Sequence, residues 1–160
     1  MNGISLPTLP KYAKVMLTAF LVVMGVTYLV GVAKIWNKTH FTVQGAIENE
    51  RGSEEKMIYP KEFGDMLSVT HYHLGGWAMM FFLVLVILMF SSYSPGLKGF
   101  FAWPPFLLAL CDAGSMWAIR YLSTGFAAPF MIVGFLMAAF FGAALILDLV
   151  NIWWGKPRAV

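Results

Sequence analysis

The chain has 160 residues, of which 59% are hydrophobic and only 12% are charged, and its net charge is +3. An ordinary soluble domain carries about twice that share of charge, so a water-soluble globular protein is excluded. The Lys and Arg residues are scattered along the sequence, which also excludes a nucleic-acid-binding surface.

The hydrophobic residues gather into apolar runs that are long enough to cross a bilayer, which takes about 20 residues per helix. The pattern predicts an all-α fold, an integral membrane four-helix bundle that forms a single membrane domain over residues 1–160. The first run is too long for the core of a signal peptide, so we expect an uncleaved anchor. The predicted spans cover residues 15–36, 73–93, 100–122 and 126–154.

The connections between these spans differ in length and polarity. Short turns at residues 94–96 and 123–125 make the last three spans sequential antiparallel neighbours. One long polar loop over residues 37–70 joins the first two spans and holds six of the eight carboxylates, so it belongs in water. Four spans place both termini on one side, and Lys11 and Lys14 before the first span favour the cytoplasm.

All three histidines are predicted to lie at one end of this bundle. His40 follows the first span, His71 and His73 open the second, and Arg120 closes the third. One interpretation is a b-type haem bound by His40, His71 or His73, with Arg120 or a lysine of the loop near its propionates. A second is a copper, zinc or iron ion held by His71 and His73, and a third is that no cofactor is bound.

The spacing of His71 and His73 restricts these interpretations. Two imidazoles that are two residues apart on one helix point about 200° away from each other. They can share a metal ion only if the helix begins after His71. Gly75 and Gly76 follow directly and would leave room for a flat macrocycle.

Two acidic residues lie within the predicted spans. Asp112 is midway along the third, where a carboxylate costs several kcal/mol unless it is neutral or paired. We consider it a candidate for a proton relay or for contact with a quinone head group, with a hydrogen bond to a neighbouring helix as the structural alternative. Asp148 lies near the opposite face, where we expect a surface ion pair with the C-terminal basic residues.

Motifs in the second half of the chain resemble a poorly characterised group of small bacterial four-span inner-membrane proteins. One motif is T-H-x-H at the second span, and the other is D-x-G-S-x-W-x-x-R-Y, formed by Asp112, Gly114, Ser115, Trp117, Arg120 and Tyr121. With Phe126 and Ala127, the resemblance covers roughly the C-terminal ninety residues. It implies a multi-pass protein of the bacterial inner membrane that is associated with respiratory or electron-transfer systems.

A shorter similarity concerns only the second span. The sequence from His71 to Trp77 looks like the opening of a span in haem- and copper-containing membrane proteins related to the nitric-oxide-response and haem-copper oxidase groups. Those proteins need further histidines on other spans. The present chain has none there, so an oxidase-type binuclear centre is not expected.

These observations together predict a small membrane subunit of a respiratory or electron-transfer system that binds a b-type haem and is not a self-sufficient enzyme. No catalytic residue is predicted. The expected partners are the lipid bilayer, other membrane subunits or cytochromes, and a quinone. Gly134, Ala138 and Gly142 share one face of the fourth span, which favours close packing within the bundle and makes a second copy of the chain a further candidate partner. The alternatives are a cofactor-free accessory subunit of a larger membrane complex, and a proton-linked transporter or sensor that uses Asp112.

Overall fold

The computed structural model describes residues 5–156, and the regular structure within them is helical. Three of the helices are long and apolar enough to cross a membrane, which confirms the prediction of an all-helical membrane protein. These are α1 (Lys11–Thr39), α3 (Phe63–Met89) and α6 (Ala127–Trp154). The shorter elements are η1 (Leu6–Thr8), α2 (Val43–Arg51), α4 (Pro95–Ala102), α5 (Pro104–Tyr121) and η2 (Thr124–Phe126).

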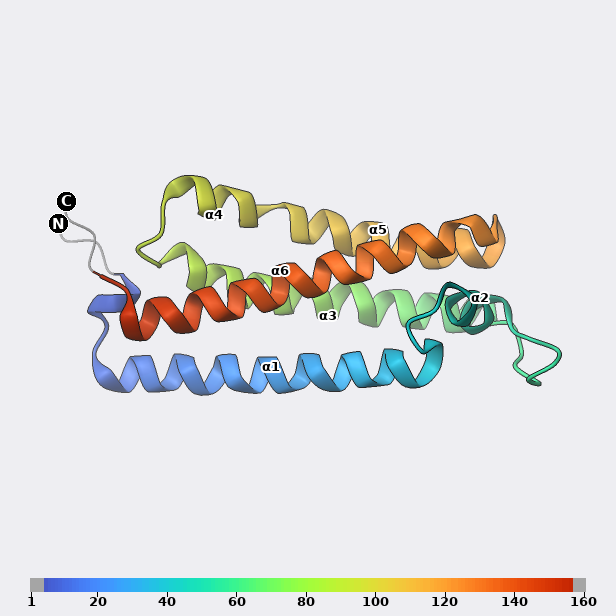
Figure 1. Ribbon diagram of the computed structural model, residues 1–160, viewed down its shortest axis with the longest axis horizontal. Helices are drawn as coiled ribbons and strands as arrows, with labels where there is room; N and C mark the ends of the chain where they lie inside the picture. The colour runs from blue at the N-terminus through green and yellow to red at the C-terminus, as the bar shows by residue number, and fades with distance from the viewer. Residues whose placement is uncertain (1–4, 157–160) are drawn as a thin grey trace.

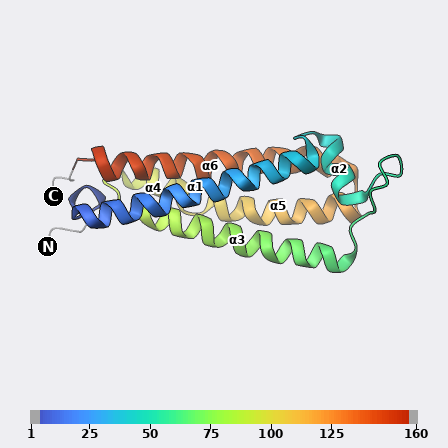
Figure 2. The same cartoon turned by 90° about the horizontal axis from the view of Figure 1, so that it is seen from below.

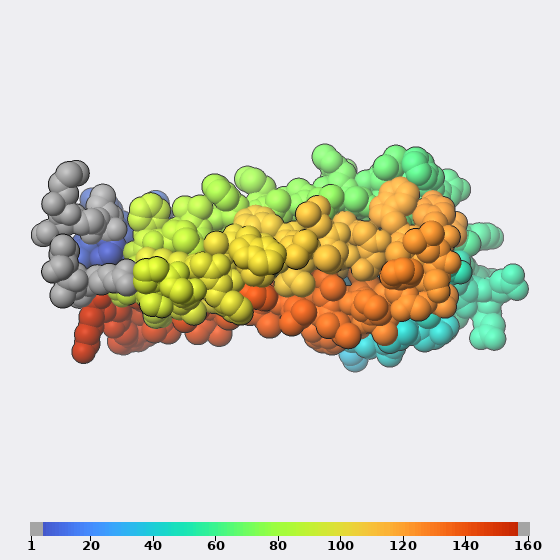
Figure 3. All heavy atoms as spheres, turned by 90° about the horizontal axis from the view of Figure 1, so that it is seen from above, coloured from blue at the N-terminus to red at the C-terminus, as the bar shows by residue number. Residues whose placement is uncertain are grey.

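α1, α3, α5 and α6 run side by side along one long axis, and α2 lies across one end of them (Figure 1). α6 packs against α1, α3 and α5, so it lies at the centre of the arrangement. Figure 2 shows that α1 and α3 diverge toward the end that carries α2. α4 and α5 lie end to end on the face seen in Figure 3, between α3 and α6.

The predicted third span is divided into two helices. α4 ends at Ala102, Trp103 forms the joint, and Pro104 and Pro105 open α5. Prolines have no backbone N–H and clash with the preceding turn, so α4 cannot continue through them. Residues 100–122 therefore form parts of two helices instead of one. The fourth predicted span, in contrast, matches α6 closely.

The polar segment over residues 37–70 is not one long loop. α1 continues to Thr39, and α2 occupies nine residues of the segment. α3 begins at Phe63, ten residues before the predicted span, so only residues 52–62 connect α2 to α3. The prediction of a loop was wrong for much of this segment, because polar residues also form helices when caps and side-chain contacts support them.

α2 is held across the ends of α5 and α6. Thr42 caps it, since its hydroxyl accepts a hydrogen bond of 2.9 Å from the backbone N–H of Gly45. Ala46 of α2 is buried against Ile119 and Ala127. The short helix thus covers the end of the bundle that contains the histidines.

An aromatic cluster joins the three long helices in the middle of the bundle. Phe81 of α3 and Phe141 of α6 are fully buried, and Trp77 stacks on Phe81 with the ring centres 5.2 Å apart. Tyr28 of α1 packs on Phe141 at 5.1 Å. α1 exposes most of its other large apolar side chains, which is expected of a helix that faces lipid.

Candidate functional site

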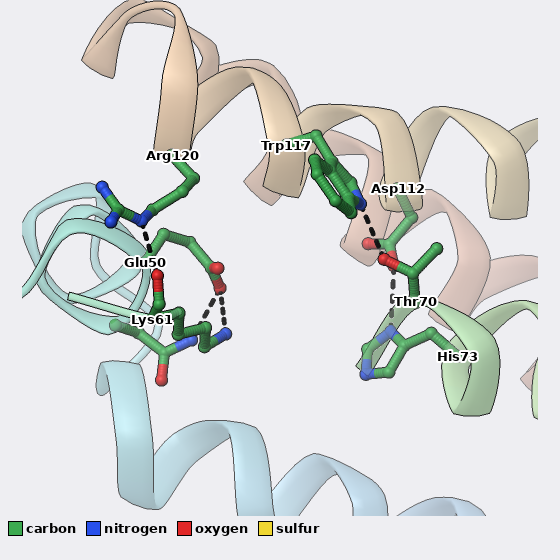
Figure 4. Close-up of polar contacts among 8 residues, drawn as sticks. Glu50, Lys61, Thr70, His73, Asp112, Trp117 and Arg120 are labelled. Atoms are coloured by element: carbon green, nitrogen blue, oxygen red, sulfur yellow. Dashed lines mark hydrogen bonds and ion pairs between the residues drawn. The ribbon is translucent and has the colours of Figure 1, made fainter. Parts of the chain in front are cut away.

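The central contact of the candidate site joins α3 to α5. Nδ1 of His73 lies 3.3 Å from Oδ2 of Asp112, as Figure 4 shows. The Asp112 side chain is 8% exposed and that of His73 is 37% exposed. The predicted need of Asp112 for a partner is therefore met by His73, a pairing that the sequence analysis did not anticipate.

This geometry determines which imidazole nitrogen is available. When Asp112 is ionised, its carboxylate can only accept hydrogen bonds, so the proton of this contact is on Nδ1 of His73. In the neutral imidazole, Nε2 then carries a lone pair that is free to bind a metal or to accept a proton. Histidines that bind metals commonly donate their other ring N–H to a carboxylate in this way, which fixes the orientation of the ring.

A second interhelical hydrogen bond lies next to this pair. Nε1 of Trp117 on α5 donates to Oγ1 of Thr70 on α3 at 2.7 Å. Thr70 precedes His73 by one helical turn, so the two contacts fix α3 and α5 at neighbouring levels (Figure 4). The ring of Phe63 also packs on Trp117, with the centres 5.5 Å apart.

The other two histidines are placed differently. α3 is helical through both His71 and His73, so their imidazoles point about 200° apart, and the condition for a shared metal ion is not met. His71 is exposed with its ring beside Tyr72. His40 ends α1 in the left-handed conformation, with φ of 48°, and its ring packs against Trp36. Across residues 5–156, no group of three or more His, Cys, Asp or Glu residues could hold a metal ion.

Arg120 belongs to a polar cluster at the same end of the molecule, which we call the Glu50 latch: Glu50, Arg51, Lys61 and Arg120. Nε of Arg120 donates to the backbone carbonyl of Lys61 at 2.8 Å, and Nζ of Lys61 lies 2.6 Å from Oε1 of Glu50. Nε of Arg51 donates to the carbonyl of Ile119. The latch ties α2 and residues 52–62 to the end of α5.

The Glu50 latch was not found by sequence analysis. Its only sequence signal was the mixture of acidic and basic residues in the polar segment, and such a mixture is typical of any solvated loop. The Glu50 side chain is in fact 1% exposed, which no local pattern indicated.

Asp148 contradicts the expected surface ion pair. The residue is 0% exposed, and neither carboxylate oxygen has a hydrogen-bond partner. Asp148 is on the face of α6 that is turned into the bundle, because Ala144, Leu145 and Ile152 at helical spacings around it are buried as well.

Comparison with known proteins assigns the chain to a family. Residues 40–159, which are 120 of the 160 residues, match the model of a family described as a transmembrane helical domain. No curated protein and no solved structure matches the chain significantly. The matched segment includes α2 to α6 and both members of the His73–Asp112 pair. The chain therefore belongs to this family of transmembrane helical domains.

Proposed function

We propose that this protein is a small subunit of a membrane electron-transfer system and that His73 binds a b-type haem through Nε2. The observation that carries the proposal is the contact between His73 Nδ1 and Asp112 Oδ2 inside the helical bundle. This contact orients the imidazole and increases its basicity, as carboxylates do for histidine ligands of metals. The electron transfer itself would be supplied by the haem iron when it is bound.

The surface beside His73 has room for a flat ligand. The His73 side chain is 37% exposed, so Nε2 is not enclosed by the chain's own core. Gly76 lies one turn further along the same helix, and a Cβ at Gly75 or Gly76 would meet no atom within 4 Å. A macrocycle can therefore approach the α3 backbone directly at this level.

A second residue to hold the haem would come from outside this chain. His40 and His71 are directed elsewhere, and we propose instead that a second copy of the chain or a cytochrome partner supplies the ligand. The small-residue face of α6 supports a homodimer, since a Cβ at Gly134 or Gly142 would meet no atom within 4 Å. Such open positions allow another helix backbone to approach closely.

For the membrane topology, we propose that α4 and α5 together form a fourth crossing. They lie alongside the three long helices, and the contact of η1 with α6 places the first and last described elements at one end of the bundle (Figure 1). We assign the protein to the bacterial inner membrane with cytoplasmic termini. The His73–Asp112 pair would then lie toward the external face.

The test is a reduced-minus-oxidised visible spectrum of the purified full chain, together with a pyridine haemochrome assay. We expect a stoichiometric b-type signal that His73→Ala abolishes and that the matched control His71→Ala retains. Asp112→Asn should keep the haem and raise its reduction potential, because a neutral amide makes the imidazole less basic. A folded protein that takes up no haem, or a His73→Ala spectrum equal to that of the wild type, would exclude this function.

The same pair favours a second candidate function, proton-linked transport or sensing. A buried carboxylate and an imidazole in contact can exchange a proton, and ionisable residues within spans are commonly parts of proton pathways. The measurement is proton uptake into proteoliposomes with a pH-sensitive dye. This candidate requires uptake that Asp112→Asn abolishes in a protein that contains no haem.

A further inference from the structure

Asp148 is the one acidic side chain of α6, and its surroundings are unusual for a carboxylate. It is 0% exposed, and both of its carboxylate oxygens are buried without a hydrogen-bond partner. α6 has no basic side chain between residues 127 and 154 that could form an ion pair with it. An ionised carboxylate that is removed from water and left unpaired is strongly unfavourable, so the neutral, protonated acid is the form that fits this site.

We propose that Asp148 is a proton-binding site of the membrane domain, separate from the His73–Asp112 pair. Asp148 binds one proton from water and releases it again, and no other bond changes. The site lies toward the end of the bundle that carries η1, whereas His73 and Asp112 lie toward α2.

A polar cluster connects this part of α6 with the turn after α3. The side chain of Asn151, one turn after Asp148, accepts a hydrogen bond of 3.0 Å from the Ser92 backbone N–H and donates one of 2.9 Å to the Ser92 hydroxyl. The phenol of Tyr93 donates to the carbonyl of Leu147, the residue next to Asp148, at 3.2 Å. These groups place polar atoms within one helical turn of Asp148, and none of them is hydrogen-bonded to its carboxyl group.

The charged and titratable groups near this end are few. Burial raises the pKa of Tyr93, which keeps its phenol protonated beside Asp148. Lys98 of α4 donates to the carbonyls of Met89 and Ser91, α1 contributes Lys11, Tyr12 and Lys14 at its start, and Lys156 follows the end of α6. η1 adds no titratable side chain, since it consists of Leu-Pro-Thr.

Infrared spectroscopy of the full chain in lipid tests the proposal, because a protonated carboxyl has a C=O stretch that an ionised carboxylate lacks. Isotope-labelled aspartate reports on only three positions, Asp65, Asp112 and Asp148. We expect a protonated-aspartate band at neutral pH that disappears reversibly at alkaline pH. Asp148→Asn should lack this band, while the matched controls Asp65→Asn and Asp112→Asn should retain it.

Two outcomes would overturn the proposal. One is that the wild-type, Asp65→Asn and Asp112→Asn proteins all lack the band at neutral pH. Asp148 would then be ionised, and this conclusion holds even if the Asp148→Asn protein does not fold. The other is a band that appears only when sodium and potassium are removed, because Asp148 would then be a cation site. Neither outcome bears on haem binding by His73, since the measurement does not use the haem.

Discussion

The Glu50 latch gives the sharpest stability prediction. Lys61→Met removes the ammonium that lies 2.6 Å from Oε1 of Glu50, and Glu50 is only 1% exposed. The carboxylate then keeps one hydrogen bond, from Asn49 at 2.8 Å, and remains buried without an opposing charge. Removing one partner of a buried ion pair typically costs about 3–5 kcal/mol. Because α2 has only nine residues, we expect this cost to open α2 locally and to leave the long helices folded.

Hydrogen exchange of the α2 amides, measured by mass spectrometry in detergent, checks this expectation. A cost of about 3–5 kcal/mol corresponds to exchange that is about 10² to 10⁴ times faster. The double variant Glu50→Gln with Lys61→Met leaves no buried charge and should recover most of the protection. Lys56→Met is the matched control, because Lys56 is 58% exposed and exposed ion pairs contribute little. If Lys61→Met changes α2 exchange by less than about tenfold, the buried pair does not hold α2 in place.

Three further changes follow from the contacts described above. Trp117→Phe removes the donor to the Thr70 hydroxyl and should lower stability by about 1 kcal/mol in thermal unfolding followed by circular dichroism. Gly45→Ala should detach α2 from α1, seen as faster α2 hydrogen exchange, because a Cβ there would overlap the last backbone carbonyl of α1. The hydrogen bond from Lys56 lowers the pKa of Glu48, so this pair contributes stability at neutral pH that is lost on acidification. Lys56→Met should remove that part of the acid sensitivity in a pH titration of unfolding.

Two of these changes have a matched control, and for each of the three there is a result that would contradict the prediction. Thr70→Val in the Trp117→Phe background should add no further loss from that bond, and fully additive losses would show that the bond contributes nothing. Gly31→Ala introduces a Cβ that meets no atom within 4 Å, so it should not destabilise, and equal effects at Gly31 and Gly45 would refute the steric argument. Unchanged acid sensitivity in Lys56→Met would mean that Glu48 is not the group that titrates.

Several features of the fold were readable from local sequence. Runs of apolar residues identified α1, α3 and α6, because a helix in lipid must be apolar along its whole length. The two prolines after Trp103 also indicate the break between α4 and α5, although the prediction placed residues 100–122 in one span. Caps and ion pairs that make α2 helical are weaker signals, and they were hidden in a segment that composition alone marked as a loop.

The geometry of the candidate site could be predicted only in part from local sequence patterns. The sequence by itself predicted that His73 and Asp112 lie on apolar helices and that an ionisable group among apolar residues, such as Asp112, needs a partner. Only the tertiary structure decided that His73 is this partner, that His71 is turned away, and that Asp148 is buried without one. The reason is that sequence sets which residues share a helix face, whereas packing between helices sets the rotation of each face about its axis.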